Sequence, residues 1–287
     1  MTVNLKFENK QIKKGLYIIP TPIGNLGDIT YRAIEILKKS DFILCEDTRI
    51  SRKLMERFGV KSKLLPNHKF NEKKNLPQII NHLRNDKIVS LISDAGTPGI
   101  SDPGAILVRQ CVKERIDIYP LPGPSAVSTA ISISGFSEKY FFYGFFPSKL
   151  KEIKNDLKSL SQLDTSIVFF ISSRKINKAI PFIKASFSER DILICREMTK
   201  FYEEYLRYKV DDLKTFDEDL KGELTIVISE RKKVKKDSLL LSESDKNNIK
   251  GMINKLSIKE IVNVISQNSN VPKKKIYNFC LKIKNEV

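Results

Sequence analysis

Residues 88–112 read IVSLISDAGTPGISDPGAILVRQCV, and this stretch decides the fold class. It begins with a short apolar run that is typical of a buried strand, and it ends with the apolar spacing of a helix. Glycine and proline make the middle, residues 93–104, an extended loop whose backbone can approach a ligand. A strand, a loop and a helix in this order form the βα unit of a parallel sheet.

The same unit recurs on both sides of this stretch. Each apolar run is followed by a segment of helical period, and the pairs are residues 16–20 with 31–40, 42–46 with 51–59, and 116–121 with 124–133. The repetition predicts an α/β domain with a largely parallel sheet, whose ligand crevice lies at the carboxyl ends of the strands.

A second set of α/β signals follows the aromatic segment that ends near Pro147. Strands are predicted at residues 166–171, 191–197, 203–209 and 223–229, with a helix at 175–185. We therefore expect an N-terminal α/β domain over residues 15–146 and a second α/β domain over residues 147–230.

The last segment, residues 231–287, predicts a basic helical module without strands. It carries fourteen Lys and Arg residues against five Asp and Glu residues. Ile249, Met252, Ile253 and Leu256 share one helical face, and Ser257 with Glu260 forms a capping box at the next helix. The last two helices resemble a helix-turn-helix, in which Lys273, Lys274 and Lys275 would contact a nucleic acid backbone. The alternative is a helical appendage that packs on the other domains or on a partner subunit.

Composition favours a polyanionic partner. The formal net charge is +17, and basic side chains gain affinity for nucleic acid by releasing counterions from phosphates. Compositional bias alone is the competing explanation.

The chain starts without an apolar signal segment, so we expect a soluble, cytoplasmic protein with no membrane role. The four cysteines lack CxxC spacing, and His68 and His82 have no ligand partners at metal-binding spacing, so we expect no metal.

Several blocks together carry a family resemblance. Residues 21–30 (TPIGNLGDIT), 46–49 (EDTR), 93–104 and 121–126 (LPGPSA) resemble, in order, the motifs of the ribosomal RNA small subunit methyltransferase I family, within the tetrapyrrole methylase superfamily. The similarity runs from about Gly15 to Ser229 and continues into the helical tail.

The resemblance implies two α/β domains of the tetrapyrrole methylase type, with S-adenosyl-L-methionine held in the cleft between them. It also implies a homodimer that acts on 16S rRNA or the small ribosomal subunit, methylating the ribose 2′-oxygen of a cytidine in the decoding region. Carried over by motif, the cofactor contacts would be Thr21, Pro22, Gly24, Asn25, Ser93, Asp94, Ala95, Gly96, Thr97, Pro98, Pro122, Gly123, Ser125, Glu197 and Gly222.

One block departs from the family. The family usually shows Phe-Tyr-Glu-Ser in the second domain, whereas this chain has Phe169-Phe170-Ile171-Ser172. Because Ile171 occupies the Glu position, any role of that carboxylate is either dispensable here or lost with a weakened activity.

Methyl transfer to a hydroxyl requires alignment and a group that accepts the proton. The sequence alone does not identify the residue that acts as this base. Asp47, Asp94 and Asp102 are candidates by location, and loop capping is the alternative role for each. Arg49 and Arg196 could bind phosphate, with surface ion pairing as their alternative.

The sequence is compatible with three functions. The chain could be an RNA 2′-O-methyltransferase, a tetrapyrrole C-methyltransferase of the same fold, or a non-catalytic ribosome-binding descendant. Tetrapyrrole enzymes usually carry a Gly-Asp-Pro loop where residues 93–98 read SDAGTP. Ile171 supports the non-catalytic alternative, which would be favoured if the purified protein bound small subunits but no cofactor.

Overall fold

The computed structural model describes residues 12–217, 220–231, 240–269 and 271–285. The chain forms two compact units, Met1–Arg231 and Lys232–Val287. Residues 231–237 read RKKVKKD, and most of this basic run lies outside the described residues.

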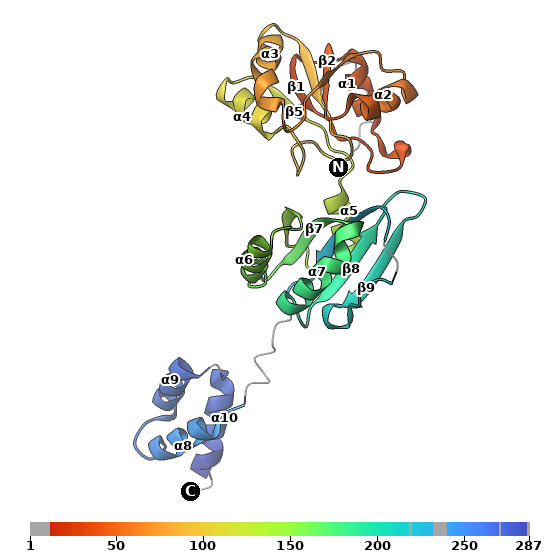
Figure 1. Cartoon of the computed structure of the whole chain (residues 1–287). Helices are drawn as coiled ribbons and strands as arrows, with labels where there is room; N and C mark the ends of the chain where they lie inside the picture. Colours follow the sequence, from red (N-terminus) through yellow and green to blue (C-terminus); the bar gives the residue numbers. More distant parts are fainter. Residues whose placement is uncertain (1–11, 218–219, 232–239, 270, 286–287) are drawn as a thin grey trace. The chain divides into compact units, whose positions relative to one another are not determined.

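The first sheet is the parallel sheet that the sequence predicts (Figure 1). Its five strands have the order β3-β2-β4-β1-β5, and every neighbouring pair is parallel. The strands are β1 (Gly15–Ile18), β2 (Phe42–Cys45), β3 (Lys63–Pro66), β4 (Ile88–Leu91) and β5 (Ile118–Pro120). All carboxyl ends therefore meet at one edge, where the loops that carry the motifs emerge.

Helices cover both faces of this sheet. One apolar cluster joins the sheet to α1 (Tyr31–Lys39) and α2 (Thr48–Arg57). Another joins the opposite face to α3 (Glu72–Arg84) and α4 (Ala105–Lys113). A short 3-10 turn, η1 (Leu26–Asp28), lies in the loop after β1. The domain is thus a three-layer sandwich, with a helical layer on each face of the sheet.

The second sheet is mixed, with the order β6-β7-β10-β8-β9. Strands β6 and β7 are parallel, and the other pairs are antiparallel. Helices α6 (Leu150–Leu160) and α7 (Ser173–Ser186) cover one face, and α5 (Ala126–Ser134) packs on the other (Figure 1). The strands are β6 (Tyr140–Phe145), β7 (Ser166–Ser172), β8 (Asp191–Arg196), β9 (Glu204–Lys209) and β10 (Glu223–Ile228), and η2 (Val210–Asp212) follows β9.

The expected boundary at residue 147 differs from the boundary between the sheets. Strand β6 ends before Pro147, yet it pairs with β7 in the second sheet. Helix α5 also packs against the second sheet, because Val127 and Ala130 are buried against Val168 and Val227. If domains are assigned by sheet membership, the second domain therefore begins before residue 140. Strand pairing and helix packing set this boundary, whereas the sequence prediction relied on the change in residue pattern near Pro147.

The C-terminal unit has its own apolar core. Its helices are α8 (Glu243–Met252), α9 (Ile258–Asn268) and α10 (Lys273–Asn285). The predicted capping box of Ser257 and Glu260 is present at α9. Leu256 differs from the prediction, because α8 ends at Met252 and the Leu256 side chain is exposed in the turn before α9.

The four cysteines are buried and unpaired. Within the described residues, no helix is both long enough and apolar enough to cross a bilayer.

Candidate active site

Three loops from the carboxyl edge of the first sheet are hydrogen-bonded to one another. The Thr21 and Gly96 backbones exchange hydrogen bonds of 2.9 and 3.0 Å, and the Thr21 hydroxyl donates to the Ser93 carbonyl at 2.9 Å. The Thr97 hydroxyl donates to the Pro124 carbonyl at 3.1 Å. The loops after β1, β4 and β5 are therefore one connected surface.

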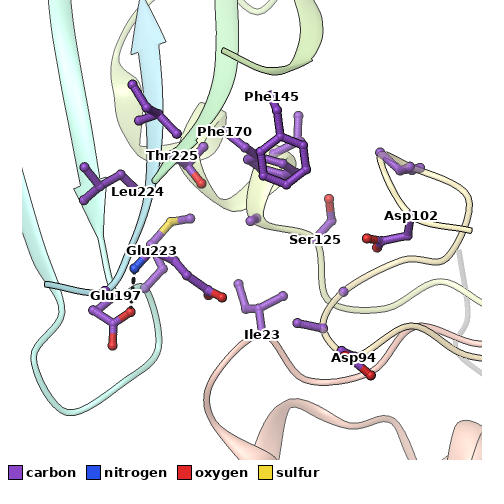
Figure 2. A pocket seen from close by; sticks show the side chains of 18 of the residues that line it. Ile23, Asp94, Asp102, Ser125, Phe145, Phe170, Glu197, Glu223, Leu224 and Thr225 are labelled. Atoms are coloured by element: carbon purple, nitrogen blue, oxygen red, sulfur yellow. Dashed lines mark hydrogen bonds between the residues drawn. The ribbon is translucent and has the colours of Figure 1, made fainter. Parts of the chain in front are cut away.

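This surface faces the second sheet across a pocket of about 370 Å³ (Figure 2). That volume lies within the range of pockets that hold small molecules and cofactors. Residues 94–97 and Asp102 line it from the loop after β4, and Ser125 lines it from the start of α5. Phe170, Glu197 and Glu223 line it from the second sheet.

An ion-pair network occupies the second-sheet side of the pocket. Lys200 Nζ lies 2.9 Å from both Glu197 Oε1 and Glu223 Oε2, and the Glu223 amide donates to Glu197 Oε1. Burial raises the pKa of Glu197, but the Glu223 amide and Lys200 outweigh it, so the net pKa is lowered. Gly222 has φ +98°, and a Cβ there would lie 2.5 Å from the Glu197 carboxyl carbon. Glycine at this position thus leaves room for the Glu197 carboxylate.

The two sides of the pocket also touch directly. The Asn25 amide donates to the Thr199 hydroxyl at 3.0 Å. A Cβ on Gly24 would lie 2.5 Å from Lys200 Cγ, so only glycine permits this approach. Glu197 and Thr199 both have positive φ values, which is uncommon for residues other than glycine and frequent at functional sites.

The proposed cofactor contacts divide into two groups. One group lines the pocket directly, and its members are Asp94, Ala95, Gly96, Thr97, Ser125, Glu197 and Gly222. The other group lies in the same loops but not among the lining residues, and its members are Thr21, Pro22, Gly24, Asn25, Ser93, Pro98, Pro122 and Gly123. Several of the second group position the loops, as Thr21 and Ser93 do through their hydrogen bonds.

The three candidate bases have different surroundings. Asp47 accepts the Arg49 amide as the N-cap of α2, pairs with the Arg49 guanidinium at 2.6 Å, and does not line the pocket. Asp94 lines the pocket but accepts the Asp47 amide at 3.2 Å. In Figure 2 the Asp102 carboxyl group is turned toward the pocket, whereas that of Asp94 is turned away. Among the three, Asp102 has the geometry of a group that meets a ligand.

The carboxyl groups at this edge also affect one another. Burial raises the pKa of Asp102 to about 6, and the nearby Glu46 adds to the shift, while a hydrogen bond with Ser93 opposes it. Burial likewise raises the pKa of Asp94. The Arg49 side chain instead holds the pKa of Asp47 well below its usual range. Asp102 is thus an acid whose protonation changes near neutral pH.

The proposed phosphate-binding residues lie at separate places. Arg49 is highly exposed and paired with Asp47, and Arg196 is paired with Glu204 at 3.1 Å. Lys273 and Lys274 are exposed at the start of α10, and Lys275 is half-buried. No group of three or more potential metal ligands occurs within the described part of the chain.

Sequence motifs alone missed much of the apolar wall. Ile100, Phe145 and Phe170 line the pocket. Ile171, which stands at the family's Glu position, borders the pocket too, but its side chain is buried in the apolar core that includes α6 and α7. Phe145 and Phe170 come together by pairing of β6 with β7, which no local motif reports. Gly144 was the one available signal, because glycine inside a strand often marks a bulge.

Comparison with known proteins defines the class. The family model of the Tetrapyrrole (Corrin/Porphyrin) Methylases matches residues 15–214, so the chain belongs to the tetrapyrrole methylase family. Its fold is also that of the solved methyltransferase CobJ (14% identity, TM-score 0.58, covering 76% of this chain and 94% of that one). Cobalt precorrin-4 methyltransferase, CbiF, is similar (22% identity, TM-score 0.55, covering 75% and 94%).

Closer relatives define the group within that class. Ribosomal RNA small subunit methyltransferase I of Buchnera aphidicola (strain Sg) is 40% identical, covering 94% of this chain and 97% of the relative. Those of Thermotoga maritima (42%, covering 75% and 97%) and Bacillus subtilis (33%, covering 96% of both) are also similar. The chain is therefore a member of the ribosomal RNA small subunit methyltransferase I family.

Proposed function

We propose that this protein is an S-adenosyl-L-methionine-dependent methyltransferase of ribosomal RNA, acting on the ribose 2′-oxygen of a cytidine in the decoding region of 16S rRNA. Its named relatives support the substrate class. The observation that carries the proposal is the pocket between the two sheets, whose lining includes seven of the cofactor contacts carried over from the family motifs.

The charge of the pocket fits this cofactor. Four carboxylates line it against one lysine: Asp94, Asp102, Glu197 and Glu223 with Lys200. That excess is notable in a chain of net charge +17. S-adenosyl-L-methionine carries a sulfonium and an ammonium group, so negative lining attracts it. Gly96, with φ +79°, brings its backbone to the pocket without a side chain in the way.

The bound cofactor would supply an activated methyl group on a sulfonium sulfur. The protein's share of the reaction is then to align an acceptor oxygen behind the S–CH₃ bond and to exclude water. The connected loops around Thr21, Gly96 and Thr97 provide a rigid wall for that alignment. Positioning rather than covalent catalysis is the main contribution of these residues.

RNA would be held mainly outside the pocket. Lys273, Lys274 and Lys275 of the C-terminal unit, with Arg49 and Arg196, are the proposed phosphate contacts, and the partner is 16S rRNA or the small ribosomal subunit. Arg49 and Arg196 would have to exchange their present carboxylate partners for phosphate. We also propose that the protein works as a homodimer in the cytoplasm, which light scattering and cell fractionation would test.

Titration calorimetry with S-adenosyl-L-methionine tests the first half of the proposal. We expect saturable binding that is unchanged by a metal chelator, because the described residues contain no metal-binding cluster. Absence of binding, both alone and with small ribosomal subunits, would favour the non-catalytic alternative.

Transfer of a labelled methyl group to isolated small subunits tests the second half. A 2′-O-methylated ribose resists alkaline cleavage, so the product can be located at single-nucleotide resolution. Label on a base, or no label on any RNA, would contradict the proposed reaction. Label on a tetrapyrrole substrate instead would favour the C-methyltransferase alternative.

A further inference from the structure

The pocket has two ends of different chemistry (Figure 2). Glu197, Lys200 and Glu223 form an ion-pair network at one end. Away from that network, the lining includes the apolar side chains of Ile100 and Phe145 and the carboxyl group of Asp102, which is turned toward the pocket, whereas that of Asp94 is turned away. An apolar wall with one hydrogen-bonding group suits a flat, neutral ring and an adjacent hydroxyl better than a charged group.

Phe145 owes its place in the pocket to a β-bulge. Strand β6 shifts register between Phe142 and Gly144, so that Phe142 pairs with Val168 but Phe145 pairs with Phe170. In a regular strand Phe145 would share the face of Tyr143, which packs in the core under α6 and α7. The extra residue turns Phe145 to the pocket face, as bulges beside active sites do.

Phe145 also keeps most of its surface exposed, although its ring packs against Phe170. Its ring meets Phe170 edge-on, with centroids 5.6 Å apart at 67°, and 62% of the residue stays accessible. Ile100, which is 44% accessible, also lines the pocket and belongs to the same loop as Asp102. An open aromatic face in a pocket is a surface on which a nucleobase can stack.

Asp102 lies where a ribose beside that base would come. Its carboxyl group faces the pocket, and the influence of Ser93 in the same loop partly offsets the rise of its pKa. Glu46 after β2 and Asp94 in the same loop are the charged groups that act on it, and both are carboxylates. Glu72 of α3 instead accepts the Gly104 amide. A carboxylate surrounded by carboxylates favours taking up a proton.

We propose that Ile100, Asp102 and Phe145 form the acceptor-nucleoside subsite, with the base stacked on Phe145 and the ribose hydroxyl at Asp102. This inference rests on the proposed function. The hydroxyl oxygen forms a bond to the methyl carbon, the S–CH₃ bond breaks with its electron pair left on sulfur, and the hydroxyl proton passes to Asp102. The sulfonium becomes a neutral thioether, so charge and atoms balance.

The same lining defines how the RNA is presented. Phosphates are repelled by four carboxylates, so the nucleotide enters base first, with its phosphates outside. A base in a stacked helix cannot reach such a wall, and the target must therefore be unstacked from its neighbours.

Tryptophan fluorescence gives a direct test, because the natural chain has no tryptophan. The Phe145→Trp variant places a single reporter on the proposed wall. We expect a short single-stranded RNA that contains cytidine to quench this fluorescence in the presence of S-adenosylhomocysteine. The Tyr140→Trp variant is the matched control, since Tyr140 is an exposed aromatic residue of the same strand that does not line the pocket.

Quenching by S-adenosylhomocysteine alone, with no further change on adding RNA, would show that residue 145 contacts the adenine ring of the cofactor. That result would overturn the inference. Equal quenching of both reporters by RNA would also overturn it. For Phe145→Ala we expect roughly tenfold weaker RNA binding with cofactor affinity unchanged. If Phe145→Ala and Tyr140→Ala behave alike while the wild-type protein methylates subunits, the subsite is wrong and the proposed function stands.

The pH dependence tests Asp102. Because its pKa is raised to about 6, the carboxylate that accepts a proton is present above that pH, and kcat/KM should fall about tenfold per pH unit below it. For Asp102→Asn we expect a loss of kcat of about 100-fold or more, much larger than the loss of S-adenosyl-L-methionine affinity that calorimetry measures when one of the four lining carboxylates is removed. An Asp102→Asn variant that keeps both its rate and the acid limb would remove Asp102 from this role.

Discussion

Glycines at the pocket act through the backbone, and two glycines of this chain allow the effect to be isolated. Gly96 has φ +79° and lines the pocket, with Ile23 Cγ2 3.4 Å from the position of an added Cβ. Gly59 has φ +63°, and an added Cβ there would meet nothing within 4 Å. Both positions strain an L residue, but only one faces the proposed ligand.

We expect Gly96→Val to weaken S-adenosyl-L-methionine binding by roughly tenfold or more, because a β-branched side chain there forces a strained backbone to shift. Gly59→Val is the control and should lose similar stability in thermal unfolding while it retains cofactor affinity. Calorimetry on both proteins decides the point. Equal affinities would remove the Gly96 backbone from the cofactor site.

At the scale of elements, a carboxylate from one helix fixes the end of the pocket loop. Glu72 of α3 is almost fully buried, and its Oε1 accepts the amides of Gly104, Ile106 and Leu107 at 3.1–3.2 Å. These are the unpaired donors at the start of α4, where a negative charge is also favourable. The loop of residues 93–104 is therefore held at two points: the Gly96 backbone is hydrogen-bonded to Thr21, and the Gly104 amide at the end of the loop is hydrogen-bonded to Glu72.

Replacing Glu72 by Ala should reduce the free energy of unfolding by about 2–3 kcal/mol, since three buried donors lose a charged acceptor. Cofactor affinity should fall as well, because the loop end is released. Glu35→Ala, which removes an exposed pair with Lys39, should cost less than about 0.5 kcal/mol. Urea unfolding measures both, and equal costs would show that the anchor is unimportant.

Strands with long or clearly bounded apolar runs could be predicted from the sequence, and strands without such runs could not. Four of the five strands of the first sheet were predictable, and so were β7, β8, β9 and β10, because their runs are long or clearly bounded. Strand β3 was not, since it is an edge strand with an exposed Lys63 and Pro66 at its ends. The motif loops were readable from the sequence, whereas Phe145 depends on strand pairing and a bulge that only tertiary structure reveals.

At the scale of the whole molecule, the C-terminal unit carries much of the excess positive charge. Its residues, 232–287, include thirteen basic and five acidic side chains, in a chain of net charge +17. The unit buries its own core, with Ile249, Ile261 and Ile276 fully inaccessible, so surface lysines can be changed without disturbing it. Its proposed contribution to RNA binding can therefore be tested separately from the fold.

Changing Lys273, Lys274 and Lys275 to Glu should weaken binding to small subunits and reduce the slope of log affinity against log salt by up to about three, since each phosphate contact contributes about 0.9. Cofactor affinity should not change. The matched control is Lys151, Lys154 and Lys158 changed to Glu on α6, which alters net charge equally. If both triple variants lose the same affinity, net charge rather than the tail surface is responsible.

The carboxylate-lined pocket within a basic protein has a consequence for selectivity among nucleic acids. The positively charged chain attracts any polyanion, including DNA and messenger RNA, whereas the carboxylates that line the pocket repel phosphate, so that the proposed acceptor subsite favours an unstacked nucleoside. Unmodifiable nucleic acids would therefore occupy the protein without being turned over, as competitive inhibitors of the ribosomal substrate. In a cell that is crowded with RNA, the occupancy of the exterior, rather than the chemistry in the pocket, would limit how quickly new subunits are methylated.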